Sequence, residues 1–541
     1  MVNVIISKRV LRRVLLPAVL LMFCFAFMAC SPSFYFRSNY SDVNTLLHEP
    51  ANLKTKPFLK AHLKNGDVCI LRDTWSVDSA KNYIVGFGTR FDFNRNKMFE
   101  GQIVIGLDSV AIFETNKKLT GTEDKRIQAL SILAGVDVLI GAICLTNPKA
   151  CFGSCPTFYI NEKDDFHYAD AEGFSNAIAP SMEYADIDAL NNLPLTENTF
   201  SLTMKNEALE THCLKDVKLL AYPRGAGERV YQSPKNEFYL CGMVHNLISA
   251  SASEGDVSRT LREQDRQEWF SLADGDNLSS KEEVFLTFNN IYGADKQGLI
   301  LNFRQTLMTT YFIYNAMGYM GDELGDMFAL LEKESTINDK LKNGIRKELG
   351  DIDVYSYDES LGKWIFQGGY YETGPIAINR QILPLSSISG NIVKLKLVLN
   401  KGLWRIDYAA LTNIKEKVTP VEISPSNILN KGVEDESALR NLSAKDSRLI
   451  SMPGSEYKFN FQLPQSGKDY ELFLYSKGYY LEWMRAHWLK DKNLWKLRQM
   501  IEYPSEYLSD EAKEYKMYES YMEHEFWGSR IDTKAFSYEE K

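Results

Sequence analysis

The sequence predicts a multidomain α+β protein, in which β-sandwich-like domains are combined with a helical insert and a mixed, aromatic-rich C-terminal region. Three observations support this fold class. The chain has 541 residues, too many for one ordinary hydrophobic core. Its apolar content of 45% and charged content of 25% are those of a globular protein. Short runs of β-branched and aromatic residues, separated by turn residues, recur along most of the chain and predict strands.

The first thirty residues have the layout of a signal peptide. Basic residues between Lys8 and Arg13 precede an apolar stretch from Leu15 to Met28, and Ala29 stands before Cys30. The segment 27–30 resembles the lipobox of bacterial lipoproteins. This resemblance implies that residues 1–29 are removed and that the thiol of Cys30 carries a palmitate-type lipid anchor. The alternative is an uncleaved N-terminal anchor, although the apolar run is short for a membrane span. In both interpretations the rest of the chain is exported from the cytoplasm.

The next two segments are expected to lead from the membrane to the first folded unit. Residues 30–57 mix polar residues and prolines without a sustained period, and we interpret them as a tether. Residues 58–148 are predicted to form a small β unit followed by an apolar helix between Ala129 and Leu145. Asp137 lies near the middle of that stretch, which favours a helix packed against protein over a membrane span.

The remaining boundaries follow changes in hydrophobic period. We expect a β-sandwich over residues 149–245, a helical region over 246–349, a β-rich domain over 350–415 and a mixed region over 416–541. The helical prediction rests on the apolar, aromatic and methionine-rich stretch from Leu299 to Leu331. The clearest strand is 393–399, where Val393, Leu395, Leu397 and Leu399 alternate with positions that include Lys394 and Lys396.

Charge and cysteine content limit the classes of partner. A net charge of -9 and a pI near 5.5 argue against nucleic acid, because phosphates are neutralised by clustered Lys and Arg. Cys151 and Cys155 are close enough in sequence to form a local disulfide. A zinc site is the weaker alternative, because no second close cysteine pair or histidine couplet follows. We therefore predict no metal and no cofactor.

Two pairs of residues are candidates for chemistry. Glu210 and His212 share one face if their segment is a strand, so the carboxylate could orient a base or help to hold a metal. The simpler interpretation is a structural hydrogen-bonded pair. A glycan hydrolase would need two carboxylates across a cleft, for which Glu372 and Asp407 are the best candidates. Tyr479, Trp483 and Trp488 could form an aromatic platform for sugar rings, although core packing is the preferred interpretation.

Several segments are similar to a known group of proteins. The sequences at 149–159, 171–175, 206–212, 372–377, 402–408 and 478–485 resemble those of uncharacterised multidomain lipoproteins of Bacteroidetes and related bacteria. The resemblance implies a shared architecture and location but assigns no functional residue. In that phylum an acidic stretch after the lipidated cysteine tends to mark surface export, and Ser31 to Phe36 contains no acid. A position in the outer membrane facing the periplasm is therefore expected.

These observations lead to two hypotheses about function. The first is a membrane-anchored envelope lipoprotein with a noncatalytic binding or structural role, whose partner is an envelope protein or glycan. The alternative is an envelope hydrolase that acts on glycan or peptide. The sequence contains no nucleophile elbow, P-loop, Rossmann fingerprint or H-E-x-x-H motif, so it identifies no common enzyme class.

Overall fold

The computed structural model describes residues 35–37, most of 58–118 and most of 155–520, together with single positions between 522 and 533. The longest segments outside this description are 1–34, 38–57, 119–154, 322–344, 483–491, 161–168 and 534–541, and shorter ones include 191–197 and 371–373. The predictions for the signal peptide, Cys30, the apolar helix at 129–145, Cys151, Glu372, Trp483 and Trp488 fall on these segments. In the described part, no helix has both the length and the apolar character needed to cross a membrane.

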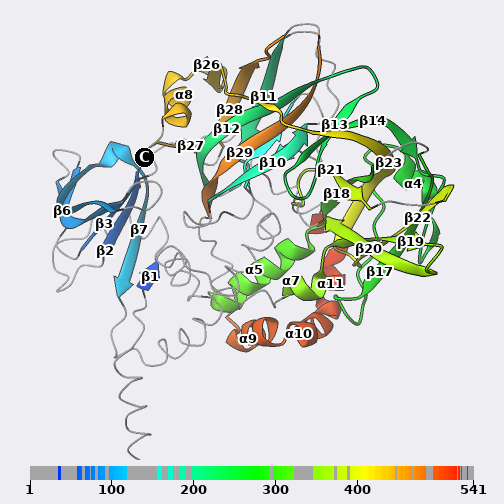
Figure 1. Cartoon of the computed structure of the whole chain (residues 1–541). Helices are drawn as coiled ribbons and strands as arrows, with labels where there is room; N and C mark the ends of the chain where they lie inside the picture. The colour runs from blue at the N-terminus through cyan, green and yellow to red at the C-terminus, as the bar shows by residue number, and fades with distance from the viewer. Residues whose placement is uncertain are drawn as a thin grey trace, which may run out of the picture.

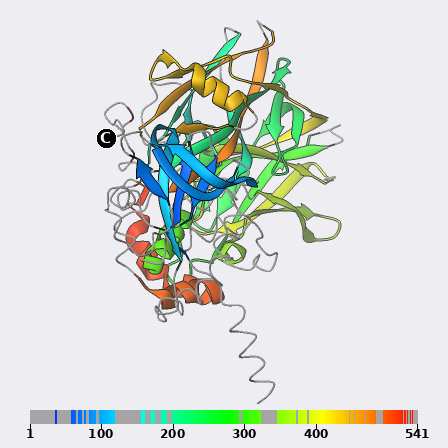
Figure 2. The same cartoon turned by 90° about the vertical axis from the view of Figure 1, so that its left-hand side faces the viewer.

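The N-terminal unit is one antiparallel sheet with its own core. Its strand order is β1-β7-β2-β3-β5-β4, and β6 pairs with β5. Leu59, Leu71, Trp75 and Ile84 are among the buried residues on its packed face, separate from the main core. The sheet lies beside the larger body (Figures 1 and 2). Its strands are β1 (Tyr35–Arg37), β2 (Phe58–Leu63), β3 (Val68–Leu71), β4 (Ser76–Asp78), β5 (Tyr83–Phe91), β6 (Lys97–Gly106) and β7 (Val110–Lys118), with a 3-10 turn η1 (Leu107–Ser109) between the last two.

Two further sheets contribute to one shared hydrophobic core. One has the order β10-β29-β12-β24, with β27 also paired to β12, and the other has the order β26-β25-β28-β11-β8-β9. Buried residues of both sheets, such as Leu214 and Phe459, belong to this core. The first sheet contains β10 (Tyr184–Leu190), β12 (Glu210–Arg224), β24 (Val421–Ile423), β27 (Leu449–Ser451) and β29 (Asp469–Glu482). The second contains β8 (Thr157–Tyr159), β9 (Ala171–Glu172), β11 (Thr199–Lys205), β25 (Asn427–Asn430), β26 (Val433–Glu434) and β28 (Glu456–Gln462).

A closed five-stranded barrel follows, in the order β13-β14-β23-β18-β21. It is closed by a parallel contact between Gln232 and Gln381. Strand β18 is buried on both faces: Leu299 and Leu301 face the shared core, whereas Ile300 belongs to a small cluster of the barrel. The strands are β13 (Arg229–Gln232), β14 (Phe238–Asn246), β18 (Gln297–Gln305), β21 (Asn379–Leu385) and β23 (Trp404–Val418).

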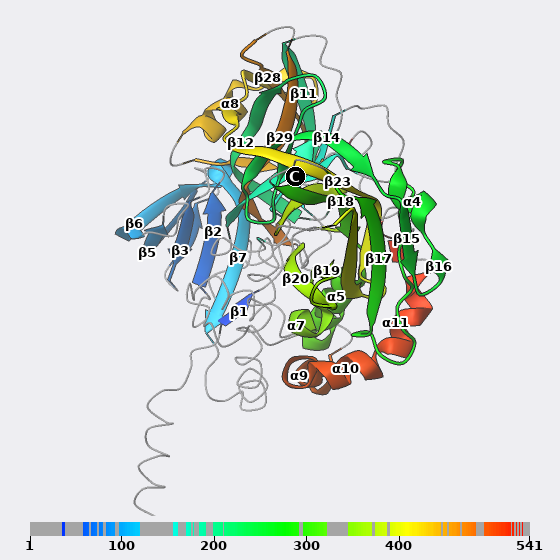
Figure 3. The ribbon, with the colours of Figure 1, turned by 45° about the vertical axis from the view of Figure 1, so that its right-hand side comes forward.

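The last sheet has the order β16-β15-β17-β22-β19-β20 and lies next to the barrel (Figure 3). Along β22, Val393, Leu395, Leu397 and Leu399 are fully buried, while the alternate positions point away from the core. Its strands are β15 (Ser249–Ala252), β16 (Gly255–Asp256), β17 (Lys281–Asn289), β19 (Ile352–Asp358), β20 (Lys363–Tyr370) and β22 (Ile392–Asn400).

Most of the described helices lie in the lower part of the body in Figure 1, whereas α4 and α8 lie higher, beside the sheets. Tyr311 and Phe312 of α5 make ring contacts with Tyr507 and Tyr515 of the C-terminal helices, which fixes these helices to one another. The helices are α4 (Ser258–Arg262), α5 (Met308–Met320), α7 (Ile345–Leu349), α8 (Glu436–Ser443), α9 (Leu494–Glu502), α10 (Pro504–Asp510) and α11 (Ala512–Glu519).

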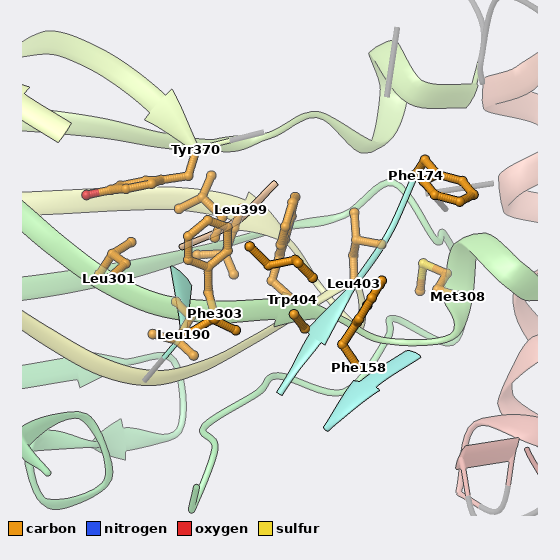
Figure 4. Close-up of a cluster of buried hydrophobic side chains, with 14 of the residues drawn as sticks. Phe158, Phe174, Leu190, Leu301, Phe303, Met308, Tyr370, Leu399, Leu403 and Trp404 are labelled. Atoms are coloured by element: carbon orange, nitrogen blue, oxygen red, sulfur yellow. The ribbon is translucent and has the colours of Figure 1, made fainter. Parts of the chain in front are cut away.

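The shared core joins residues that are distant in sequence. Figure 4 shows Phe158 and Leu190 of the sandwich sheets near Phe303 and Trp404 of the barrel and Leu399 of the last sheet. Such a continuous apolar interior is the main source of stability of the folded body.

The structure is β-rich with several sheets and few helices, which confirms the predicted fold class. The helical prediction for 246–349 fits only loosely, because β15 to β18 form in its first half beside the short helix α4, and α5 begins at Met308. Strand β18 is buried at all nine positions although it contains Asn302 and Arg304, so its polar residues do not mark an exposed face. Its short apolar run, 299–301, does not by itself distinguish a strand from a buried helix. The expected segments also do not form separate sheets, because β11 and β12 pair with β28 and β29.

Candidate functional site

The structure brings Glu210 and His212 together inside the sandwich. Both side chains start from β12, and Nε2 of His212 lies 2.6 Å from Oε1 of Glu210. Both are fully buried. The ring of Tyr480 on the neighbouring strand makes an edge contact with His212 at 6.3 Å, and the side-chain amide of Asn206 donates to the backbone carbonyl of Glu210. The pair is therefore sealed by protein, which fits a structural role better than contact with a substrate.

A buried thiol and further carboxylates lie near this pair. The Cys155 thiol donates to Oε2 of Glu172 at 3.4 Å, and the backbone N–H of Glu172 donates to Asp188. Burial, followed by the negative charges of Glu172 and Glu210, raises the pKa of Cys155 well above its ordinary value. The thiol is thus held protonated, which makes it a weak nucleophile. Cys155 is a free thiol in this structure, whereas the sequence suggested a bridge to Cys151, which lies outside the described residues.

Asp407 lies on strand β23 of the barrel. It is the extra residue of a β-bulge, which falls where the register of β23 with β18 shifts between Asn302 and Phe303. It is 3% exposed and accepts a hydrogen bond from Nδ2 of Asn302 at 3.3 Å. Burial is the largest cause that raises the pKa of Asp407 to about 6. Its proposed partner Glu372 lies outside the described residues, so of the suggested carboxylate pair the structure places Asp407 alone.

We expect the stability of the protein to depend on the ionisation of Asp407. Its pKa is raised on folding, so its stabilising contribution is full below about pH 4 and is lost as the pH rises through about 6. Asp407→Asn keeps an oxygen acceptor for Asn302 but cannot ionise. Relative to wild type, this variant should gain on the order of 2 to 3 kcal/mol of unfolding free energy between pH 4 and pH 8. Chemical unfolding at both pH values measures the difference.

The control for this comparison is Asp276→Asn, which changes an exposed aspartate. Its stability relative to wild type should be the same at both pH values. A difference between wild type and Asp407→Asn that does not change with pH would contradict the assignment of a raised pKa to Asp407.

Two arginines on barrel strands β18 and β23 form a network with two glutamates from outside the barrel strands. Arg304 and Arg405 lie opposite each other on β18 and β23. Glu268 accepts from Nε and Nη2 of Arg304 at 2.6 and 2.7 Å. Glu523, which follows α11, lies 2.6 Å from Arg304 and 2.8 Å from Arg405. The network thus ties the C-terminal region to the barrel through charged groups that are mostly withdrawn from water.

A different surface carries the features of a binding site. The outward positions of β17, β19, β20 and β22 place aromatic rings and lysines side by side on the face of the last sheet that points away from the core. The ammonium groups of the lysines lie over the aromatic rings there. We call this surface the aromatic–lysine face, and its members are Phe285, Tyr355, Tyr357, Trp364, Phe366, Lys394 and Lys396.

The rings of this face come from β17, β19 and β20, and they form one group of three and one pair. The ring centroids of Trp364 lie 5.2 Å from those of Tyr357 and 5.9 Å from those of Phe285. Phe366 is 5.4 Å from Tyr355. Phe366 is 56% exposed and Phe285 is 39% exposed, so apolar ring surface is presented to solvent on a rigid sheet.

Part of this face was visible in the sequence. The alternation in 393–399 already places Lys394 and Lys396 on the side opposite the buried leucines, and Trp364 and Phe366 are two residues apart in a strand-like run. What the sequence did not show is that Phe285 belongs to the same face, because the pairing of β17 with β22 joins segments more than one hundred residues apart. The aromatic platform considered near the C-terminus is different, since Tyr479 is buried in the core.

The described residues contain no group of three or more His, Cys, Asp or Glu side chains that could hold a metal ion. Comparison with models of known protein families gave no match. Comparison with curated proteins gave none either. Among solved structures, the secreted serine protease VesC from Vibrio cholerae aligns with 70% of this chain and 75% of its own, at 10% identity and a TM-score of 0.13. A score this low carries no argument about fold or activity.

Proposed function

We propose that the chain is a lipid-anchored protein of the bacterial envelope, in the outer membrane facing the periplasm, and that it acts by binding an envelope component. The observation that carries the binding role is the aromatic–lysine face, where Phe366 and Phe285 expose ring surface on a well-packed sheet. Exposed apolar patches are typical of interaction sites. The location is supported by the signal-peptide layout of residues 1–29 and by the lipobox-like segment that ends at Cys30.

The alternative, an envelope hydrolase, has less support from the geometry of the candidate residues. Glu210 and His212 contact each other and are fully buried. Asp407 is 3% exposed and is held by Asn302. A general acid must come within hydrogen-bond reach of its substrate, and these side chains face protein. Binding is therefore the function that the described residues favour.

The binding role is tested by photo-crosslinking in intact cells. A benzophenone-bearing phenylalanine analogue is placed at Phe366, and in a second strain at Trp495 of α9, which is 72% exposed and lies outside the face. Benzophenone reacts with nearby C–H bonds, so it captures protein and glycan alike. We expect a light-dependent, higher-mass product from position 366 and none of that mass from position 495.

Two results would argue against the proposal. Products of the same mass and yield from both positions would indicate random collision at the protein surface. No product from position 366, in a strain where the protein is folded and present at its normal level, would mean that the face is not occupied in the envelope.

A further inference from the structure

We infer that the aromatic–lysine face binds an extended, uncharged glycan chain, with sugar rings stacked on Trp364 and Phe366. This inference rests on the proposed binding function and names the class of ligand for the same surface. It is carried by three features of the face: the arrangement of its rings, the balance of its charges and the position of its lysines.

The rings offer the kind of surface on which sugars stack. The π-face of an aromatic ring carries partial negative charge, and the C–H bonds on one face of a pyranose carry partial positive charge, so the two attract. Phe366 pairs with Tyr355 on the adjacent strand, and Trp364 bridges the space between Tyr357 and Phe285. The ring surface therefore runs across β20, β19 and β22 to β17, which suits a chain of several sugars better than a single one.

Each lysine of the face is paired with a carboxylate beside it. The ammonium group of Lys396 lies 2.7 Å from Glu283, and that of Lys394 lies 3.1 Å from Glu359. A polyanion would have to compete with these carboxylates for the lysines. An uncharged chain needs no such exchange, because its hydroxyl groups can accept from the ammonium groups and donate to the carboxylates at the same time.

The lysines also lie among the rings rather than at the rim. The ammonium nitrogen of Lys396 is 5.5 Å from the ring centres of both Tyr355 and Trp364, and that of Lys394 is 5.6 Å from the ring of Tyr357. Lysine and glutamate are depleted at the centres of protein–protein interfaces, because they lose hydration there. A wet, hydroxyl-rich ligand leaves these groups hydrated or hydrogen-bonded. The composition of the face thus favours a glycan over a protein partner.

The test uses the full-length protein in detergent and, as the probe, the delipidated and protease-treated polysaccharide fraction of the envelope of the producing cell, immobilised on a sensor. Wild type should bind saturably, and the binding should persist in high salt because it does not depend on charge. Trp364→Ala and Phe366→Ala should each weaken binding about tenfold, which corresponds to the loss of one stacking contact.

Matched controls separate the face from exposed aromatic residues in general. Trp495→Ala and Phe87→Ala remove exposed rings from α9 and from the N-terminal sheet, and both should bind as wild type does. The thermal unfolding of Phe366→Ala should match that of wild type, since this ring is more than half exposed. A loss of binding in that variant is then not a loss of folding.

Three results would overturn the inference: no retention of wild type on the polysaccharide, equal retention of wild type and both face variants, or retention that disappears in high salt. Its failure is distinguishable from failure of the proposed function. If position 366 crosslinks in cells to a polypeptide that lacks carbohydrate, the face is a binding site and the glycan assignment is wrong.

Discussion

Replacing Arg304 with methionine is expected to lower the free energy of unfolding by about 3 to 5 kcal/mol. Arg304 is fully buried and donates two hydrogen bonds to Glu268, which is 3% exposed. Removing the guanidinium leaves a buried carboxylate without its main partner, and that loss costs far more than the lost packing of a few methylene groups. Denaturant unfolding followed by tryptophan fluorescence gives the difference.

The matched control is Arg440→Met on α8. Arg440 pairs with Glu436 at 3.0 Å, but both side chains are more than two-thirds exposed. An exposed pair of this kind contributes about 0.5 kcal/mol or less. A second variant, Arg304→Met combined with Glu268→Gln, removes the buried negative charge and should recover part of the stability. If Arg304→Met unfolds within about 0.5 kcal/mol of wild type, the network does not stabilise the barrel as described.

Local patterns predicted strands well where only one face is buried. The alternation of Val393, Leu395, Leu397 and Leu399 predicted a strand, and β22 forms there with all four side chains buried. The N-terminal runs at 67–71, 83–87 and 102–106 likewise lie in or beside β3, β5 and β6. Alternation is a property of the local sequence, so it can be recognised without knowing which strand is the partner.

Strand pairing could not be predicted, because it depends on contacts between distant segments. Strand β11 pairs with β28, and β12 pairs with β29 along its whole length, although the partners are more than 240 residues apart. Nothing in the local pattern of one strand specifies which other strand will complete its sheet. The expected boundaries at 245, 349 and 415 therefore divide segments that the fold joins.

In the candidate sites, too, local spacing was predictable from the sequence and contacts between distant segments were not. The spacing of Glu210 and His212 placed them on one face, and the structure has them in contact. Their burial was not predictable, because it depends on Tyr480 and on the other strands that cover them. The buried network was missed as well, since Glu268 and Glu523 reach Arg304 from 36 and more than 200 residues away.

Cys30→Ala is expected to abolish membrane attachment. If signal peptidase cuts before Cys30 and the thiol carries the lipid, removing the sulfur removes the site of acylation. The hydrocarbon chains supply affinity for the bilayer at about 0.8 kcal/mol per buried methylene group, so their loss removes the lipid anchor. The matched control is Cys69→Ala, which removes a buried thiol of the N-terminal sheet and should leave attachment unchanged.

The central claim, a lipid-anchored protein of the envelope, is tested most directly by the intact mass and detergent partitioning of the protein isolated from its own envelope. We predict a mature chain that begins at Cys30, carries two or three acyl chains and enters the detergent phase in wild type and Cys69→Ala but not in Cys30→Ala. An unlipidated chain, whether full-length or cleaved and water-soluble, would contradict it, and the compartment in which the aromatic–lysine face meets its ligand would have to be assigned again.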